Sequence, residues 1–192
     1  LNYYNVMRDF TMLNWGGLTV DQTLTPTYVT THHLLHVLRL TANEPLVIFN
    51  GNDGEFLASI INIHKNKVTV KIEKFADINN ESPLYIHLAQ AVSRGEKMDF
   101  TIQKAVELGV NEITPIITEH CNVTLSAERW GKKAEHWEKI IIHACEQCGR
   151  NSIPKINSTV NINEWITTVK TDAKLVLHHR AKQSISQINT LF

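Results

Sequence analysis

The stretch LYIHLAQAVSRGEKMDFTIQKAVELGVNEITPIIT, residues 84–118, decides the fold of this chain. It opens and closes on apolar runs, over 84–91 and 113–118, that have the length and composition of buried strands. Between the runs, apolar residues recur at helical spacing and form one stripe: Met98, Ile102, Ala105 and Val106. A strand, a helix and a strand in this order predict a βαβ unit, whose two strands lie parallel in one sheet.

Two local signals predict where the helix of this unit begins and ends. Ser93 and Glu96 have the spacing of a capping box, with Ser93 as the N-cap of the helix. Gly109 stands where a glycine commonly ends a helix, because glycine adopts the left-handed conformation without steric cost. We therefore expect the helix to begin just after Ser93 and to end before Gly109.

The rest of the second half continues the alternation of strands and helices. Apolar spacing over 134–148 predicts a long helix, which Gly149 ends. A short helix is expected over 163–169, and Leu175-Val176-Leu177 is expected to form a third parallel strand. These elements predict an α/β layer.

The first 78 residues predict a small β domain. An apolar run over 46–49 precedes Asn50-Gly51, a pair that favours a tight hairpin turn, and residues 68–72 alternate at period two. Short strands separated by turns suggest a small barrel. One helix is expected over 31–40.

A polar segment over 76–83, ADINNESP, ends in proline and is the best candidate for a domain linker. The expected domains are therefore residues 1–78 and residues 84–192. The predicted fold class is α/β, with a small β-barrel followed by a parallel α/β domain.

Composition excludes several classes of protein. Of 192 residues, 43% are hydrophobic and 20% are charged, which is ordinary for a globular protein. Lys and Arg number 19 and Asp and Glu number 19, so a uniformly basic surface for nucleic acid is excluded, although a local basic patch is not. No run of about 18 apolar residues predicts a membrane span. Three cysteines, an odd number, favour a reducing, cytoplasmic compartment.

Histidine and cysteine pairs suggest metal or redox chemistry, but each has a simpler interpretation. His32 and His36 are four residues apart, which suits two metal ligands, yet packed or solvated histidines are the more common case. Cys145 and Cys148 form a CxxC pair at the end of a predicted helix, whereas redox pairs occupy the helix start. We expect small buried thiols there and no metal site.

Basic residues gather in the second half of the chain, in two groups. Arg94, Lys97 and Lys104 mark one face of the first predicted helix, and a second group brackets the next helix: Arg129, Lys132, Lys133 and Arg150. Acidic residues are interleaved with both groups, so a solvated, salt-bridged surface is one interpretation. The alternative is a surface that follows the phosphates of RNA.

Two long motifs carry a family resemblance. The first is SRGEKMDFTIQK (93–104) with ELGV (107–110), and the second is HACEQCGR (143–150) with Pro154. Together with Val37-Leu38-Arg39 and Phe49-Asn50-Gly51, they closely resemble the bacterial 16S rRNA uracil-N3 methyltransferase family (the RsmE family). The resemblance covers nearly the whole chain from about Met7 onward.

The resemblance implies a fold, a cofactor and partners. It implies an N-terminal PUA-like β-barrel that contacts RNA, followed by a SPOUT-type parallel α/β domain closed by a knot. Members of the family use S-adenosylmethionine and act as homodimers on 16S ribosomal RNA or the small ribosomal subunit. The sequence ends at Phe192, before the glycine loop and knot segment of the family, so an incomplete SPOUT domain and an inactive isolated chain are expected.

The resemblance also implies site residues. Arg150 is expected to contact the target uridine, and Glu146 is a weaker candidate for the base. For Arg150 the alternative is a helix-end arginine that pairs with Glu146 or with the last free carbonyls of its own helix, and for Glu146 it is a carboxylate that pairs with arginine or caps structure. Leu177 and His178 are expected to border the cofactor pocket. The expected RNA contacts are Arg8, Arg39, Arg94, Lys97, Lys104, Arg129 and Lys132.

Three functions follow from these observations. The first is methylation of a uridine in 16S rRNA. The second is RNA binding without catalysis, and the third is a small-molecule enzyme that uses the CxxC pair. The resemblance favours the first.

Overall fold

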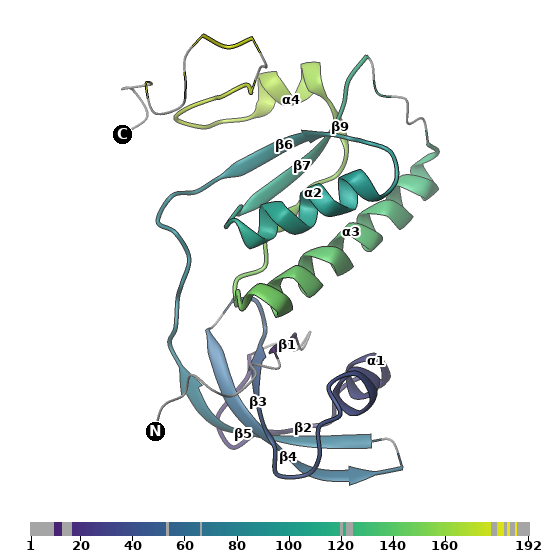
Figure 1. Ribbon diagram of the computed structural model, residues 1–192, viewed down its shortest axis with the longest axis vertical. Helices are drawn as coiled ribbons and strands as arrows, with labels where there is room; N and C mark the ends of the chain where they lie inside the picture. The colour runs from purple at the N-terminus through teal and green to yellow at the C-terminus, as the bar shows by residue number, and fades with distance from the viewer. Residues whose placement is uncertain are drawn as a thin grey trace.

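The computed structural model contains two sheets, one in each half of the chain (Figure 1). The linker between β5 (Lys67–Ala76) and β6 (His87–Ala91) runs along one side of the molecule and joins the two halves (Figure 1). The structure describes residues 10–12, 17–52, 54–65, 67–119, 121, 125–177, 180–182, 184 and 187.

The first sheet has five strands in the order β1-β3-β4-β5-β2. Their bounds are β1 Phe10–Met12, β2 Thr23–Leu24, β3 Pro45–Phe49, β4 Glu55–His64 and β5 Lys67–Ala76. β1 pairs parallel with β3, and the other neighbours pair antiparallel, with Ile48 opposite Phe56. The strands predicted over 46–49 and 68–72 are confirmed. In the described residues β1 and β2 are the edge strands, so closure into a barrel stays a prediction.

The turn after β3 is longer than the predicted two-residue hairpin, because β4 begins only at Glu55. Gly51 in this turn has a φ of +87°, and a Cβ atom there would lie 2.8 Å from Cδ1 of Ile153. The turn therefore packs closely against the second half of the chain at a position where only glycine fits.

The helix predicted over 31–40 begins and ends about three residues earlier. It consists of α1 (Tyr28–His32), which continues directly into a π-helical turn, η2 (His33–Val37). The N–H of Leu38 donates to the carbonyl of His33 at 3.0 Å, the five-residue spacing of a π-helix. Arg39 then adopts a φ of 58°, a left-handed conformation that does not continue the helix.

The second sheet is parallel, and the predicted βαβ unit is confirmed. Its strands are β6 (His87–Ala91), β7 (Glu112–Ile117), β8 (Lys155–Ile156) and β9 (Val160–Asn161), and β7 pairs with each of the other three. The helices are α2 (Glu96–Glu107), α3 (Ala127–Cys148) and α4 (Ile162–Thr168). None of the helices in the described part of the chain combines the length and the apolar character of a membrane span.

Glycines end both long helices as predicted. Gly109 has a φ of 92° just after α2, and Gly149 has a φ of 75° at the end of α3. The start of α2 differs, because its N-cap is Gly95 and not Ser93. Gly95 has a φ of 58°, so the helix cannot extend back through it, and Arg94 lies before the helix. The capping-box prediction was therefore wrong.

The third strand expected at Leu175-Val176-Leu177 is also absent from the described structure. These residues have no strand conformation, and Val176 and Leu177 are each 85% exposed. The short strands β8 and β9 both pair with β7, in the place where the expected strand over 175–177 would have joined the sheet. The run over 175–177 is apolar in the sequence, but its side chains are exposed in the structure.

β3 supplies side chains to two hydrophobic cores. Leu46 and Ile48 point into the core of the first sheet, whereas Val47 and Phe49 pack with the residues of α2 and α3. Phe49 is fully buried beside this second core, whose largest member is Trp137. The two halves of the chain therefore share apolar packing along both faces of β3.

Candidate functional site

The strands of the parallel sheet end at one edge, where α2 and α3 begin (Figure 1). After β6 the chain stays on this edge, because the N–H of Val92 donates to the carbonyl of Ile116 at 2.9 Å. Cys121 comes four residues after β7, and its thiol donates to the carbonyl of Val92 at 3.4 Å. Ligands of open α/β sheets bind outside the carboxyl ends of the strands. We call this region, residues 92–97 with Cys121 and the start of α3, the carboxyl edge.

The helices α2 and α3 lie side by side and run in the same direction. Near their starts, Asp99 accepts hydrogen bonds from His136 at 2.9 Å and from Nε1 of Trp137 at 3.3 Å. Asp99 is in the first turn of α2, whereas His136 is in the third turn of α3. At about 1.5 Å per residue, α3 therefore projects about 9 Å beyond the start of α2.

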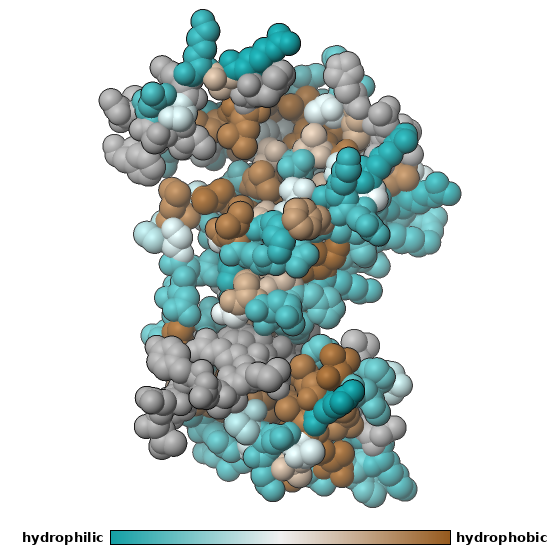
Figure 2. Space-filling model, viewed as in Figure 1, coloured by the Kyte–Doolittle hydropathy of each residue, from teal (hydrophilic) through white to brown (hydrophobic). Residues whose placement is uncertain are grey.

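Cations lie on this projection, on the segment just before α2 and in the first turn of α2. They are Arg94, Lys97, Arg129, Lys132 and Lys133. Figure 2 shows hydrophilic side chains over this side of the molecule. Lys132 pairs with Glu128 at 2.7 Å, and Nζ of Lys133 lies 5.3 Å from the centre of the Trp137 ring. The starts of two helices add partial positive charge, so the carboxyl edge can attract an anion such as a phosphate.

The other predicted RNA contacts lie elsewhere. Lys104 is in the last turn of α2, where its Nζ lies 2.7 Å from the carboxylate of Glu107. Arg39 follows η2 in the first half of the chain. Arg8 lies outside the described residues. The structure therefore brings together four of the seven predicted contacts: Arg94, Lys97, Arg129 and Lys132.

Arg150 lies at the opposite end of α3 and joins three segments of the chain. Its guanidinium forms a two-pronged ion pair with Glu81 of the linker, in which Nε lies 2.9 Å from the carboxylate. Nη1 donates to the carbonyls of Val106 and Val110 at 2.8 and 3.0 Å, just where α2 ends. The Arg150 side chain is only 11% exposed. Arg150 is therefore a helix-end arginine, as the alternative expected, but its partners are Glu81 and the carbonyls at the end of α2, and not Glu146 or the carbonyls of α3.

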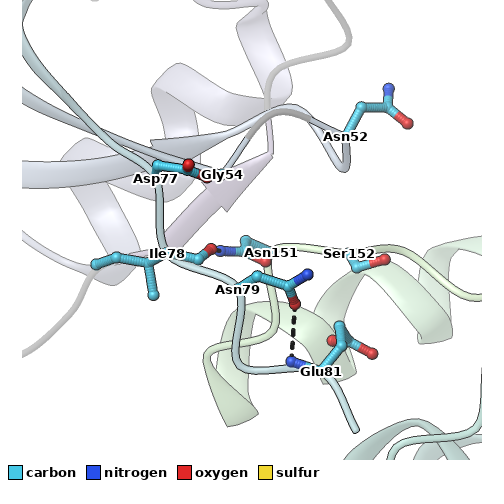
Figure 3. Close-up of a pocket in the computed structure, with 8 residues that line it drawn as sticks. All are labelled: Asn52, Gly54, Asp77, Ile78, Asn79, Glu81, Asn151 and Ser152. Carbon is cyan, nitrogen blue, oxygen red and sulfur yellow. Dashed lines mark hydrogen bonds between the residues drawn. The ribbon is translucent and has the colours of Figure 1, made fainter. Parts of the chain in front are cut away.

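Asn151 extends the same contact to the linker. Its Nδ2 donates to the carbonyl of Ile78 at 2.6 Å, and the side chain is buried. Beside it lies a polar pocket of about 220 Å³, lined by linker residues and by the β3–β4 turn (Figure 3). In that pocket the side chain of Asn79 accepts from the N–H of Glu81 at 2.9 Å. We call the pair Arg150 and Glu81, with Asn151, the linker clamp.

Glu146 also lies near the far end of α3. Its carboxylate is 2.9 Å from Nδ1 of His143, one turn earlier on the same helix, and its side chain is 12% exposed. It is 17 residues along the helix from Arg129, or about 25 Å. Neither residue predicted as catalytic therefore lies at the carboxyl edge.

The CxxC pair contains one buried and one exposed thiol. Burial, with smaller contributions from nearby Cys148, Glu81 and Glu146, raises the pKa of Cys145 to about 12. Its thiol donates to the carbonyl of Ser152, and Cys148 is exposed. A redox pair needs a thiolate at neutral pH, and Cys145 does not supply one. The described residues hold no cluster of three or more metal-binding side chains.

These two thiols should differ sharply in reactivity. We expect iodoacetamide at pH 8 to alkylate Cys148 in the folded protein and to alkylate Cys145 at least about 100-fold more slowly, because only the thiolate reacts. Mass spectrometry of the peptide that carries both residues measures the two rates, with Cys148→Ser to isolate Cys145. Unfolding should abolish the difference, and fast alkylation of Cys145 in the folded protein would contradict this assignment.

A polar network occupies the amino edge of the parallel sheet. Glu112 accepts hydrogen bonds from Nδ2 of Asn157 at 2.6 Å and from the hydroxyl of Tyr85 at 2.8 Å. Burial alone would raise the pKa of Glu112, but these hydrogen bonds and the nearby His87 and Lys155 outweigh it and hold that pKa below its ordinary value. The network therefore stabilises the fold with Glu112 ionised.

This lowered pKa predicts how stability changes with pH. The contribution of Glu112 is fully present above the pKa of an unfolded glutamate, about 4.3, and is lost as pH falls through the lower folded value. Glu112→Gln should therefore be less stable than the original at pH 7, and the difference should shrink below about pH 4. Urea unfolding at several pH values measures it. Glu128→Gln, whose side chain is 77% exposed, serves as the control and should show no such trend.

The structure describes only one of the two predicted cofactor residues. Leu177 is 85% exposed, and His178 lies outside the described residues. Two features of the site had no prediction of their own. Glu81 was assigned only to a linker, although its carboxylate was available as a partner for Arg150, and Cys121 formed no part of the predicted site.

Comparison with known proteins agrees with both halves of the structure. Residues 80–192 match the model of an RNA methyltransferase domain, and residues 30–73 match that of an RNA methyltransferase PUA domain. Ribosomal RNA small subunit methyltransferase E of Buchnera aphidicola subsp. Schizaphis graminum is 40% identical over 89% of this chain and 70% of its own length. The protein of the same name from Buchnera aphidicola subsp. Acyrthosiphon pisum is 43% identical over 77% of this chain and 58% of its own length.

Solved structures show the same fold. A methyltransferase from Legionella pneumophila, solved with bound S-adenosylmethionine, has a TM-score of 0.83 and 43% identity, and the match covers 90% of this chain and 70% of that one. Ribosomal RNA small subunit methyltransferase E from Neisseria gonorrhoeae, also bound to S-adenosylmethionine, has a TM-score of 0.87 and 35% identity over 94% of this chain and 74% of that one.

A PUA-type unit joined to a parallel α/β unit with a basic carboxyl edge defines an RNA methyltransferase of the kind that uses S-adenosylmethionine. Within that class, the identities above place the chain in the ribosomal RNA small subunit methyltransferase E family. The family resemblance carried by the motifs over 93–110 and 143–150 is confirmed.

Proposed function

We propose that this chain methylates N3 of a uridine in 16S ribosomal RNA, with S-adenosylmethionine as the methyl donor. The observation that carries the proposal is the cluster of Arg94, Lys97, Arg129 and Lys132 at the carboxyl edge of a parallel sheet. That edge is where α/β proteins bind ligands, and its charge suits RNA. The proposal thus goes beyond family membership, because it assigns this chain one substrate base and one methylated atom, N3.

The chemistry sets what the residues must do. The donor supplies an electrophilic methyl group on sulfur, and uracil N3 must lose a weakly acidic imide proton to attack it. Negative charge then spreads to O2 and O4 of the base, and cations nearby stabilise it. Arg94 lies between β6 and α2 and Lys97 lies in the first turn of α2, so both are placed to hold RNA at that edge.

The placement of Leu177 and His178 beside the cofactor stays a prediction, since Leu177 is 85% exposed and His178 lies outside the described residues. The carboxyl edge offers cations and helix starts, which suit an anion such as a phosphate or a carboxylate.

The geometry supports a positioning role for Arg150. Four of the five N–H donors of its guanidinium are used by Glu81 and by two carbonyls of the α2 end, and the side chain is only 11% exposed, which leaves little of it for a base. We propose that the linker clamp fixes the first unit, which contacts RNA as a PUA-like domain, relative to the unit that carries the carboxyl edge. Glu146, held by His143, has a structural role in the same part of the chain.

We also propose a homodimer that acts in the cytoplasm on the small ribosomal subunit or its RNA. Exposed apolar side chains on α2 and at its C-cap support self-association, since Phe100 is 62% exposed and Leu108 is 81% exposed. Large apolar side chains on a helix surface commonly mark protein contacts.

Transfer to 16S rRNA tests the function directly. The protein is incubated with S-adenosylmethionine and a 16S rRNA transcript, the RNA is digested to nucleosides, and these are separated by liquid chromatography and mass spectrometry. We expect 3-methyluridine among the nucleosides, at about one per transcript. A methyl group at another atom, or on another class of RNA alone, would overturn the proposal, and RNA binding without transfer would favour the non-catalytic alternative.

A further inference from the structure

An aromatic ladder lies on the exposed face of α1 and η2, in the first unit. Tyr28, His32 and His36 follow one another at four-residue intervals. The ring centres of Tyr28 and His32 are 6.4 Å apart, and those of His32 and His36 are 4.6 Å apart. Tyr28 is 77% exposed and both histidines are exposed. Because these three side chains are exposed, parts of their ring faces are open to solvent and are available to a ligand.

The other side of the same helix is held firmly. Leu34 is fully buried in the core of the first sheet, and Thr31 is buried, with its hydroxyl donating to the carbonyl of Pro26. The π-helical turn at 33–37 adds a second signal, because such turns are rare and occur frequently at functional sites. The ladder is therefore a fixed surface and not a mobile loop.

The charge around the ladder favours an anionic partner. No Asp or Glu occurs between Asp21 and Glu44, a stretch that contains the whole ladder and three histidines. Arg39, which is exposed, follows the ladder by three residues. Unpaired bases of RNA stack on Tyr and His rings while their phosphates pair with arginine, so single-stranded RNA has the chemistry that fits this surface.

We propose that Tyr28, His32 and His36 form a stacking surface for unpaired bases of the RNA substrate, with Arg39 near an adjacent phosphate. The inference rests on the proposed function for the identity of the substrate. It names a second RNA contact, in the other unit of the chain from the carboxyl edge. Stacking depends on ring faces, so this contact should tolerate many sequences and require single strands.

Binding of a fluorescent single-stranded RNA, followed by anisotropy, tests the ladder in the full chain. Tyr28→Ala and His36→Ala should each weaken binding about 5-fold or more, up to about 150-fold where a base is fully stacked. The slope of log affinity against log salt should stay the same, because no phosphate contact is removed. Tyr28→Phe keeps the ring and should bind within about 2-fold of the original. His64→Ala, which removes an exposed histidine outside the ladder, should have no effect.

Each other outcome overturns the inference. Unchanged affinity for Tyr28→Ala with His36→Ala would show that no base stacks there, and an equal loss for Tyr28→Phe would point to a hydroxyl contact. Equal losses on an RNA with abasic sites would exclude stacking, and a loss confined to assembled ribosomal particles would point to a protein partner. Methyl transfer is measured separately, so absent 3-methyluridine with intact ladder effects would sink the proposed function and not the ladder.

Discussion

Replacement of Arg150 by alanine is expected to destabilise the protein by about 3–5 kcal/mol, the usual cost when one partner of a buried ion pair is removed. The side chains of Arg150 and Glu81 are 11% and 14% exposed, so the substitution leaves the Glu81 carboxylate with little water to replace its partner. The carbonyls of Val106 and Val110 also lose the donor that satisfies them. Urea unfolding measures the loss.

Further variants separate this cause from general disruption. Glu81→Gln combined with Arg150→Ala removes the stranded charge, so the double variant should be more stable than the sum of the two single losses predicts. Arg129→Ala, an exposed arginine near the start of the same helix, should change stability by no more than about 0.5 kcal/mol. If Arg150→Ala lowered the free energy of unfolding no more than Arg129→Ala does, the linker clamp would not stabilise the fold. A variant that keeps its stability but loses methyl transfer would restore the catalytic role.

Local patterns predicted the elements that depend on local chemistry. The βαβ unit, the ends of α2 and α3 at Gly109 and Gly149, and the short helix α4 all follow from spacing and from left-handed glycines. The start of α2 could not be predicted in this way. Gly95 adopts a left-handed φ of 58° and becomes the N-cap, so the helix does not begin after Ser93 as the capping-box spacing predicted. The apolar run at 175–177 shows the limit of hydropathy, since it predicts burial only where the fold provides a neighbour.

The surroundings of the predicted site residues depend on contacts between residues far apart in the sequence, which local patterns do not predict. Arg150 and Glu81 are 69 positions apart, and no periodicity links a helix end to a linker carboxylate. The basic residues of α2 illustrate the same point. Lys97 and Lys104 are seven residues apart and share a face in the sequence, but in the structure they lie at opposite ends of the helix, one at the carboxyl edge and one beside Glu107. The family motifs identified the class of protein without resolving these positions.

Removal of the cations at the carboxyl edge should produce the largest effect on RNA binding. Replacement of Arg94, Lys97 and Arg129 together with alanine should weaken binding of single-stranded RNA about 100-fold or more at 50 mM salt, whatever its sequence. The reason is the release of counterions from RNA, which contributes a slope of roughly −0.7 per neutralised phosphate, so the triple variant should flatten the salt dependence by about 2. Anisotropy at several salt concentrations measures both quantities.

Lys104→Ala is the matched control for this prediction, because it removes a cation from the same helix at its other end. Its Nζ pairs with Glu107 and lies 5.6 Å from the centre of the Phe100 ring, so it should leave both the affinity and the salt slope unchanged. An equal effect of Lys104→Ala would mean that RNA follows the whole length of α2 and not the carboxyl edge. A triple variant that lost affinity without a change in slope would show that the three cations hold the fold and not the phosphates.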